Sequence, residues 1–164
     1  MAGRLRRAWD AQRPGPDVRA VLARTERERM LAWGRTERGE PVVATDRGLW
    51  AYGEQLAWTE IDQVRWDEPD LAITAMDGET RRLRLGQERD LPAVIRAQVD
   101  ASVIASRALR LLPDGRGATV AARRGVTGQL TWQVRYDAGV PSQDPAVVQR
   151  VEELIAGLRV ELGI

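Results

Sequence analysis

Apolar and polar residues alternate through the middle of the chain, from Met30 to Leu85, in short runs separated by turn residues. Alternation with a period of two is typical of strands that bury one face of a sheet. Asp77-Gly78 between two such runs is a hairpin signal, and Asp46-Arg47-Gly48 supplies similar turn chemistry earlier. The pattern therefore predicts an antiparallel meander of about seven short strands.

Two later stretches follow a helical period. Residues 90–102 begin with Asp90 and residues 145–162 follow Asp144; each has proline in its first turn, which is typical of a capped helix start. A shorter helix is predicted to begin at Asp17, with that side chain as its N-cap. The apolar stripe of the last helix comprises Val147, Val151, Leu154, Ile155, Leu158 and Leu162.

These patterns divide the chain into three parts. Residues 1–29 form an Arg-rich arm and a short helix, residues 30–102 the meander and its helix, and residues 103–164 three further strands and the terminal helix. The predicted fold class is α+β: an antiparallel β-barrel or sandwich capped by a helix, extended by a three-stranded antiparallel sheet with a terminal helix. We expect the extension to pack on the first part.

Composition narrows the chemistry. The chain has no Cys and no His, which excludes thiolate metal sites, Cys nucleophiles and Ser-His dyads. All 25 basic residues are Arg, a bias that fits GC-rich coding and that also excludes Schiff-base lysines. The net charge of +1 does not favour nucleic acid as a partner. We expect a cytoplasmic protein with no cofactor and no metal.

Two motifs carry a family resemblance. Thr45-Asp46-Arg47-Gly48-Leu49 and the segment from Trp58 through Ile61 to Val64 together resemble the hallmark of the bacterial pleckstrin-homology-like (PH-like) family, over roughly residues 30–102. The resemblance implies a non-enzymatic binding fold, whose members include lipid-headgroup binders, peptide binders and scaffolds. Headgroup binders of this family carry basic residues around the first loop. Arg35 and Arg38 lie near that loop here, and Glu37 and Glu40 offset their charge.

The six tryptophans serve two expected purposes. Because the chain has no Phe, tryptophan must supply core volume, and we predict that role for Trp33, Trp58, Trp66 and Trp132. Trp50 and Tyr52 alternate with Leu49 and Ala51, so they face the opposite side of their strand. We predict Trp50 and Tyr52 as part of a partner-binding face.

Clustered charges suggest further candidates. An anion or partner surface is possible if two Arg-bearing strands lie side by side; its candidates are Arg81, Arg82, Arg84, Arg123 and Arg124. Ordinary outward-facing arginines on a sheet are the alternative. The acidic cluster Asp67, Glu68 and Asp70 lacks the pattern of a calcium loop, so we predict a solvated turn there.

The predicted function is a non-catalytic cytoplasmic interaction module. Its partner would be a protein that meets an open sheet edge and an aromatic or arginine-lined face, or a second copy that pairs through the terminal helix. One alternative is peripheral membrane or anionic-ligand binding through Arg4, Arg6, Arg7 and Trp9. A second is a hydrolase or isomerase using Asp/Glu pairs, which requires two carboxyl groups converging in a pocket, at least one with a raised pKa.

Overall fold

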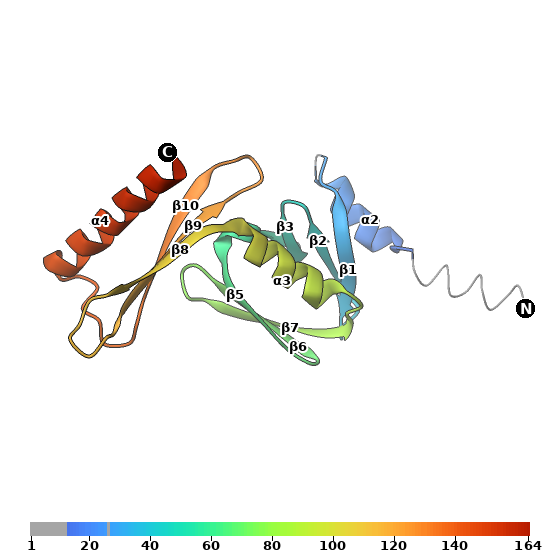
Figure 1. Ribbon diagram of the computed structural model, residues 1–164. Coiled ribbons are helices and arrows are strands. Elements are labelled where there is room, and N and C mark those ends of the chain that lie inside the picture. The colour runs from blue at the N-terminus through green and yellow to red at the C-terminus, as the bar shows by residue number, and fades with distance from the viewer. Residues whose placement is uncertain (1–12, 26) are drawn as a thin grey trace, which may run out of the picture. The chain divides into compact units, whose positions relative to one another are not determined.

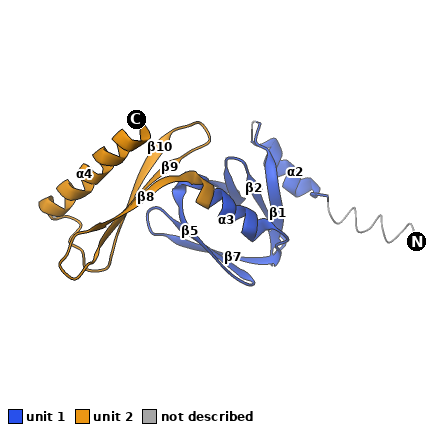
Figure 2. Ribbon diagram, viewed as in Figure 1, with its two compact units in different colours: residues 1–99 blue, residues 100–164 orange. Residues whose placement is uncertain are grey.

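The computed structural model describes residues 13–25 and 27–164 and confirms the α+β class. The chain divides into two compact units, residues 1–99 and residues 100–164 (Figure 2). The first unit contains a seven-stranded antiparallel sheet with the order β4-β3-β2-β1-β7-β6-β5, and the second a three-stranded sheet with the order β10-β9-β8 (Figure 1).

The elements follow one another closely along the chain. The strands of the first sheet are β1 (Met30–Thr36), β2 (Pro41–Thr45), β3 (Gly48–Ala51), β4 (Glu54–Ala57), β5 (Ile61–Asp67), β6 (Asp70–Ala75) and β7 (Thr80–Gln87). Those of the second sheet are β8 (Val103–Arg110), β9 (Gly117–Arg124) and β10 (Leu130–Tyr136). The helices are α2 (Pro16–Ala23), α3 (Leu91–Ser102) and α4 (Pro145–Leu162), and η1 (Trp58–Glu60) is a 3-10 turn.

The first sheet is not closed into a hydrogen-bonded barrel. Its edges are β4 and β5, which follow one another in the sequence but do not pair. Between them η1 buries Trp58 and Thr59 and redirects the chain into the other half of the sheet, where β5 pairs with β6. The sequence pattern identified the strands, and the 3-10 turn explains why the two edge strands stay apart.

The main core lies on one face of this sheet. Residues from β2, β3, η1, β5, β6 and β7 pack together with Leu91, Ile95 and Val99 of α3. These three residues recur at helical spacing, so α3 presents one apolar stripe to the sheet. Leu83 and Leu85 of β7 are buried in the same core, as their alternation predicts.

The opposite face of β1 and β2 is covered by α2. Val18 of α2 is fully buried and packs with Trp33 and Val43 in a second apolar cluster. Consequently every residue from Val42 to Thr45 is buried. In a strand with one face exposed to solvent, buried and exposed residues would alternate instead. α2 therefore turns β2 into a strand that is covered on both faces.

The second unit is a three-stranded sheet with α4 packed on one face. Val151 and Leu158 of α4 contact Ala118 and Val120 of β9 in a separate core. The predicted helix start is confirmed, since the Asp144 carboxylate accepts a hydrogen bond from the Ala146 backbone N–H at 2.8 Å. This unit buries its own apolar residues around the predicted stripe.

Two sequence predictions in the first unit are wrong. Asp17 is not the N-cap of α2: Gly15 occupies that position and Pro16 begins the helix, because the Asp17 carboxylate is bound by Arg35 instead. Trp66 is 36% exposed, since it lies on the edge strand β5, opposite Leu71, where no further strand covers it. Trp33 and Trp58 are buried as predicted, and Trp132 is partly buried against the second core.

Candidate docking groove

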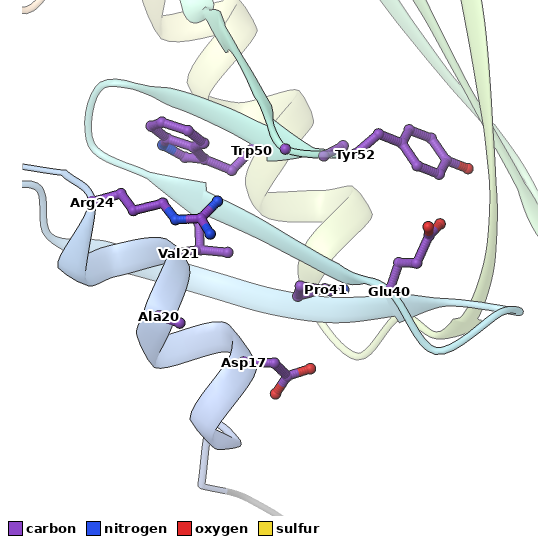
Figure 3. Close-up of a pocket in the computed structure, with 10 residues that line it drawn as sticks. Asp17, Ala20, Val21, Arg24, Glu40, Pro41, Trp50 and Tyr52 are labelled. Carbon is purple, nitrogen blue, oxygen red and sulfur yellow. The ribbon is translucent and has the colours of Figure 1, made fainter.

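A groove of about 360 Å³ lies between α2 and the β2–β3 region of the sheet (Figure 3). It forms because α2 covers β1 and β2 on the outer face of the sheet, while β3 extends beyond the helix. Its lining consists of Asp17, Ala20, Val21, Arg24, Glu40, Pro41, Trp50, Ala51, Tyr52 and Gly53. The groove thus brings together both aromatic residues that the sequence singled out for a partner face.

The walls of the groove are mainly apolar. Ala20 and Val21 lie on the helix side, and Pro41 and Trp50 on the sheet side (Figure 3). Val21 and Trp50 also pack against the cluster around Val18, so both walls rest on the same buried core. A groove supported in this way is preformed and needs little rearrangement to admit apolar side chains.

Tyr52 lies at the rim because of the turn that carries it. Ala51 pairs with Glu54, so Tyr52 and Gly53 form a two-residue hairpin loop between β3 and β4. Both have positive φ, 52° for Tyr52 and 78° for Gly53, which is the conformation of the turn that suits twisted hairpins. The Tyr52 side chain is 56% exposed in this position. The backbone thereby holds Tyr52 at the edge of the groove, with its ring exposed and directed away from α2 (Figure 3).

Trp50 is positioned by Glu28, a residue that sequence reasoning missed. The Glu28 carboxylate accepts hydrogen bonds from the Thr45 hydroxyl at 2.7 Å, from Trp50 Nε1 at 3.2 Å and from Gln55 Nε2 at 3.0 Å. Trp50 and Gln55 are opposite one another in the β3–β4 register, so one carboxylate can reach both. This hydrogen-bond network could not be predicted from a local sequence motif, because its members lie up to 27 residues apart.

The residues that carry the sequence resemblance stabilise the β2–β3 turn through hydrogen bonds. The Thr45 hydroxyl is buried in the β2–β3 turn and accepts hydrogen bonds from the backbone N–H groups of Arg47 and Gly48. Trp58 Nε1 donates to the Thr45 carbonyl at 3.0 Å, and the Asp46 carboxylate accepts from the Arg29 backbone N–H at 2.9 Å. The two halves of the motif thus contact one another and fix the turn that leads into Trp50.

Asp17 and Arg35 join α2 to β1 at one end of the groove. Both Asp17 carboxylate oxygens accept from the Arg35 guanidinium, with a distance of 2.9 Å from Nη2 to Oδ1. Arg35 also donates to the Gly39 carbonyl and lies over the Trp33 ring. The hydrogen bond from Arg35 lowers the pKa of Asp17 from 3.8 to about 2. Asp17 is therefore a charged anchor and a poor proton donor.

This ion pair predicts a pH-dependent contribution to stability. Because folding lowers the pKa of Asp17, its contribution is fully present above about pH 4 and is lost as the pH falls through about 2. The Asp17 side chain is 41% exposed, so we expect a difference in unfolding free energy of at most about 1 kcal/mol between wild type and Asp17→Asn. Thermal unfolding should show this difference near pH 6 and its decrease toward pH 2. An unchanged difference would contradict the assignment.

The predicted arginine surface does not form as one sheet face. Arg81 pairs with Glu54 at 2.8 Å and Arg84 with Glu37 at 3.3 Å, both on β7 of the first sheet. Arg123, on β9 of the other sheet, is only 4% exposed. It donates to Ser102 Oγ and Gln133 Oε1 at 2.7 and 3.0 Å. Arg123 is therefore a buried structural residue, whereas Arg82 and Arg124 are exposed.

The remaining candidates form no second site within the part of the chain that the structure describes. Arg4, Arg6, Arg7 and Trp9 lie outside the described residues. Asp67 and Asp70 pair at the β5–β6 hairpin, and within residues 13–25 and 27–164 no group of three or more acidic residues could hold a metal ion. None of the helices described is long and apolar enough to cross a membrane. No protein-family model matches the chain, and neither a curated protein nor a solved structure matches it.

Proposed function

We propose that this chain is a non-catalytic, cytoplasmic, PH-like interaction module that binds a segment of a protein partner in the groove between α2 and β3. The observation that carries the proposal is a groove with mainly apolar walls that has an exposed tyrosine, Tyr52, at its rim. Tyrosine and tryptophan are enriched at protein interfaces because they combine a large apolar area with one polar group.

The size and shape of the groove favour a peptide segment. A volume of about 360 Å³ is at the lower end of the range for ligand sites and accommodates a few apolar side chains. A protein segment laid along a helix can insert such side chains while its backbone remains partly solvated. The exposed edge strand β4 adjoins β3 and offers unpaired backbone groups beside the groove.

The chemistry of the groove supports binding rather than catalysis. A hydrolase that uses paired carboxyl groups needs one of them to hold a proton near neutral pH. Arg35 lowers the pKa of Asp17 to about 2, which is the wrong direction for a general acid. The remaining lining offers aromatic, aliphatic and backbone groups together with one exposed cation, Arg24, and one exposed carboxylate, Glu40, which suit recognition.

Site-specific photo-crosslinking tests the proposal. A photoreactive amino acid at position 52 should form a discrete protein adduct in extract of the native cell. The matched control is position 126, because Val126 and Tyr52 are both 56% exposed. We expect an adduct from position 52, none from position 126, and loss of the adduct when Trp50→Ala removes one wall of the groove.

Two results would contradict the proposal. Equal adducts from positions 52 and 126 would indicate non-specific contact. An adduct from position 52 that survives Trp50→Ala would show that the exposed tyrosine contacts its neighbour without use of the groove.

A further inference from the structure

The charged residues at the two ends of the groove have opposite sign. Resting on the proposed function, we infer that the bound segment carries an acidic residue beside Arg24, a basic residue beside Glu40, and apolar residues between them. Both side chains line the groove and both residues are exposed. Figure 3 shows them at opposite ends, with the apolar walls between them.

Arg24 defines the cationic end. It is the C-cap residue of α2, and its side chain extends beside Trp50 at the groove (Figure 3). No carboxylate of the described residues forms a salt bridge with it, in contrast to Arg35 of β1, which pairs with Asp17 near the other end of α2. A carboxylate on the ligand would complete the pairing of this guanidinium.

Glu40 defines the anionic end. It lies directly before β2 and its side chain points toward the region of Tyr52 (Figure 3). Asp17 is nearby in the lining, but Arg35 already neutralises it. Among the described residues, Glu40 is therefore the carboxylate at this end without a salt-bridge partner, and a basic ligand residue would pair with it.

The length of the groove sets the spacing of the two ligand charges. Asp17 and Arg24 are seven residues apart along α2, which corresponds to about 10 Å at about 1.5 Å per residue. An extended peptide rises about 3.3 Å per residue. A five-residue segment has four such steps between its end residues, about 13 Å, so a segment with three apolar residues between its charges is long enough to span the groove.

Four blocked five-residue peptides provide the probes. They share three central residues, leucine, alanine and leucine, and end in one acidic and one basic residue, two acidic residues, two basic residues, or two serines. The full-length chain is titrated with each, and binding is followed by NMR through the Trp50 indole N–H, which donates to Glu28 at the groove. Assignment of that signal by Trp50→Phe ensures that the other five tryptophans do not contribute.

For the wild type, the peptide with mixed charges should bind about three to ten times more tightly than the serine peptide. Arg24→Glu should transfer the preference to the doubly basic peptide, and Glu40→Arg should transfer it to the doubly acidic one. The controls Arg65→Glu and Glu152→Arg alter exposed charges that are not part of the groove lining and should leave the ranking unchanged.

Each failure has a distinct meaning. If all four peptides bind equally and the variants change nothing, the charge inference is overturned while docking in the groove stands. If no peptide shifts the Trp50 signal, the groove is not a docking site and both proposals fall. If removal of residues 1–12 is needed before any peptide binds, and charge then has no influence, the chain's own N-terminal segment is the occupant and the inference is overturned.

Discussion

Replacement of Gly117 by alanine is expected to destabilise the second unit by about 3 kcal/mol or more. Gly117 begins β9, opposite Arg110 of β8. A Cβ at this position would overlap the Leu109 carbonyl oxygen and would lie 2.8 Å from the carbonyl carbon and 3.0 Å from the Arg110 Cα. These are backbone atoms, so no rotamer change relieves the clash, and β8 must separate from β9.

Amide hydrogen exchange measures this effect unit by unit. Protection should fall in β8, β9 and β10 and remain in the first sheet. The control is Gly157→Ala in α4, where a Cβ meets no atom within 4 Å. That change should stabilise the helix by about 0.5 to 1 kcal/mol, because glycine is unfavourable inside a helix. Unchanged protection in Gly117→Ala would contradict the close approach of the two strands.

Val18→Asp is expected to detach α2 and abolish peptide docking, while the main sheet stays folded. Val18 is the one fully buried residue of this eight-residue helix, and it packs on Trp33 and Val43. A carboxylate buried there without a partner costs several kcal/mol, more than so short a helix gains by docking. We expect a loss of about 2 to 4 kcal/mol in unfolding free energy, together with loss of the crosslink from position 52.

Ala23→Asp provides the matched control, since it places the same charge on an exposed position of α2. It should leave both stability and the crosslink close to those of the wild type. If Val18→Asp retains the crosslink, α2 is not a wall of the binding site and the proposed groove is wrong. Circular dichroism checks that the strands of the first unit remain folded in the variant.

Elements with a strong local signal were predictable. Alternation located the strands, and the Asp77-Gly78 hairpin follows from residues adjacent in the sequence: the Gly78 backbone has φ of 87° and the Asp77 carboxylate accepts from the Glu79 N–H. The cap at Asp144 and the apolar stripe of α4 were equally local. In the site, the alternation of Trp50 and Tyr52 with Leu49 and Ala51 was enough to nominate both aromatic residues.

Errors arose where a distant partner decided the outcome. Asp17 has the right residue type and position for an N-cap, but Arg35, 18 residues away, binds its carboxylate. Arg123 looked like an outward cation, but Ser102 and Gln133 hold it in a buried position. Trp66 has the correct parity for the core but lies on an edge strand, and strand order is not encoded in alternation.

The sequence alone determined the class of fold, the succession of its elements and the absence of Cys and His chemistry, because these depend on residue type and short-range periodicity. Only the tertiary structure decided that α2 covers β2, that Glu28 orients Trp50, and that a groove with opposite charges at its ends results. The physical reason is that burial and hydrogen bonding depend on which surfaces come into contact. These contacts join segments that are far apart along the chain.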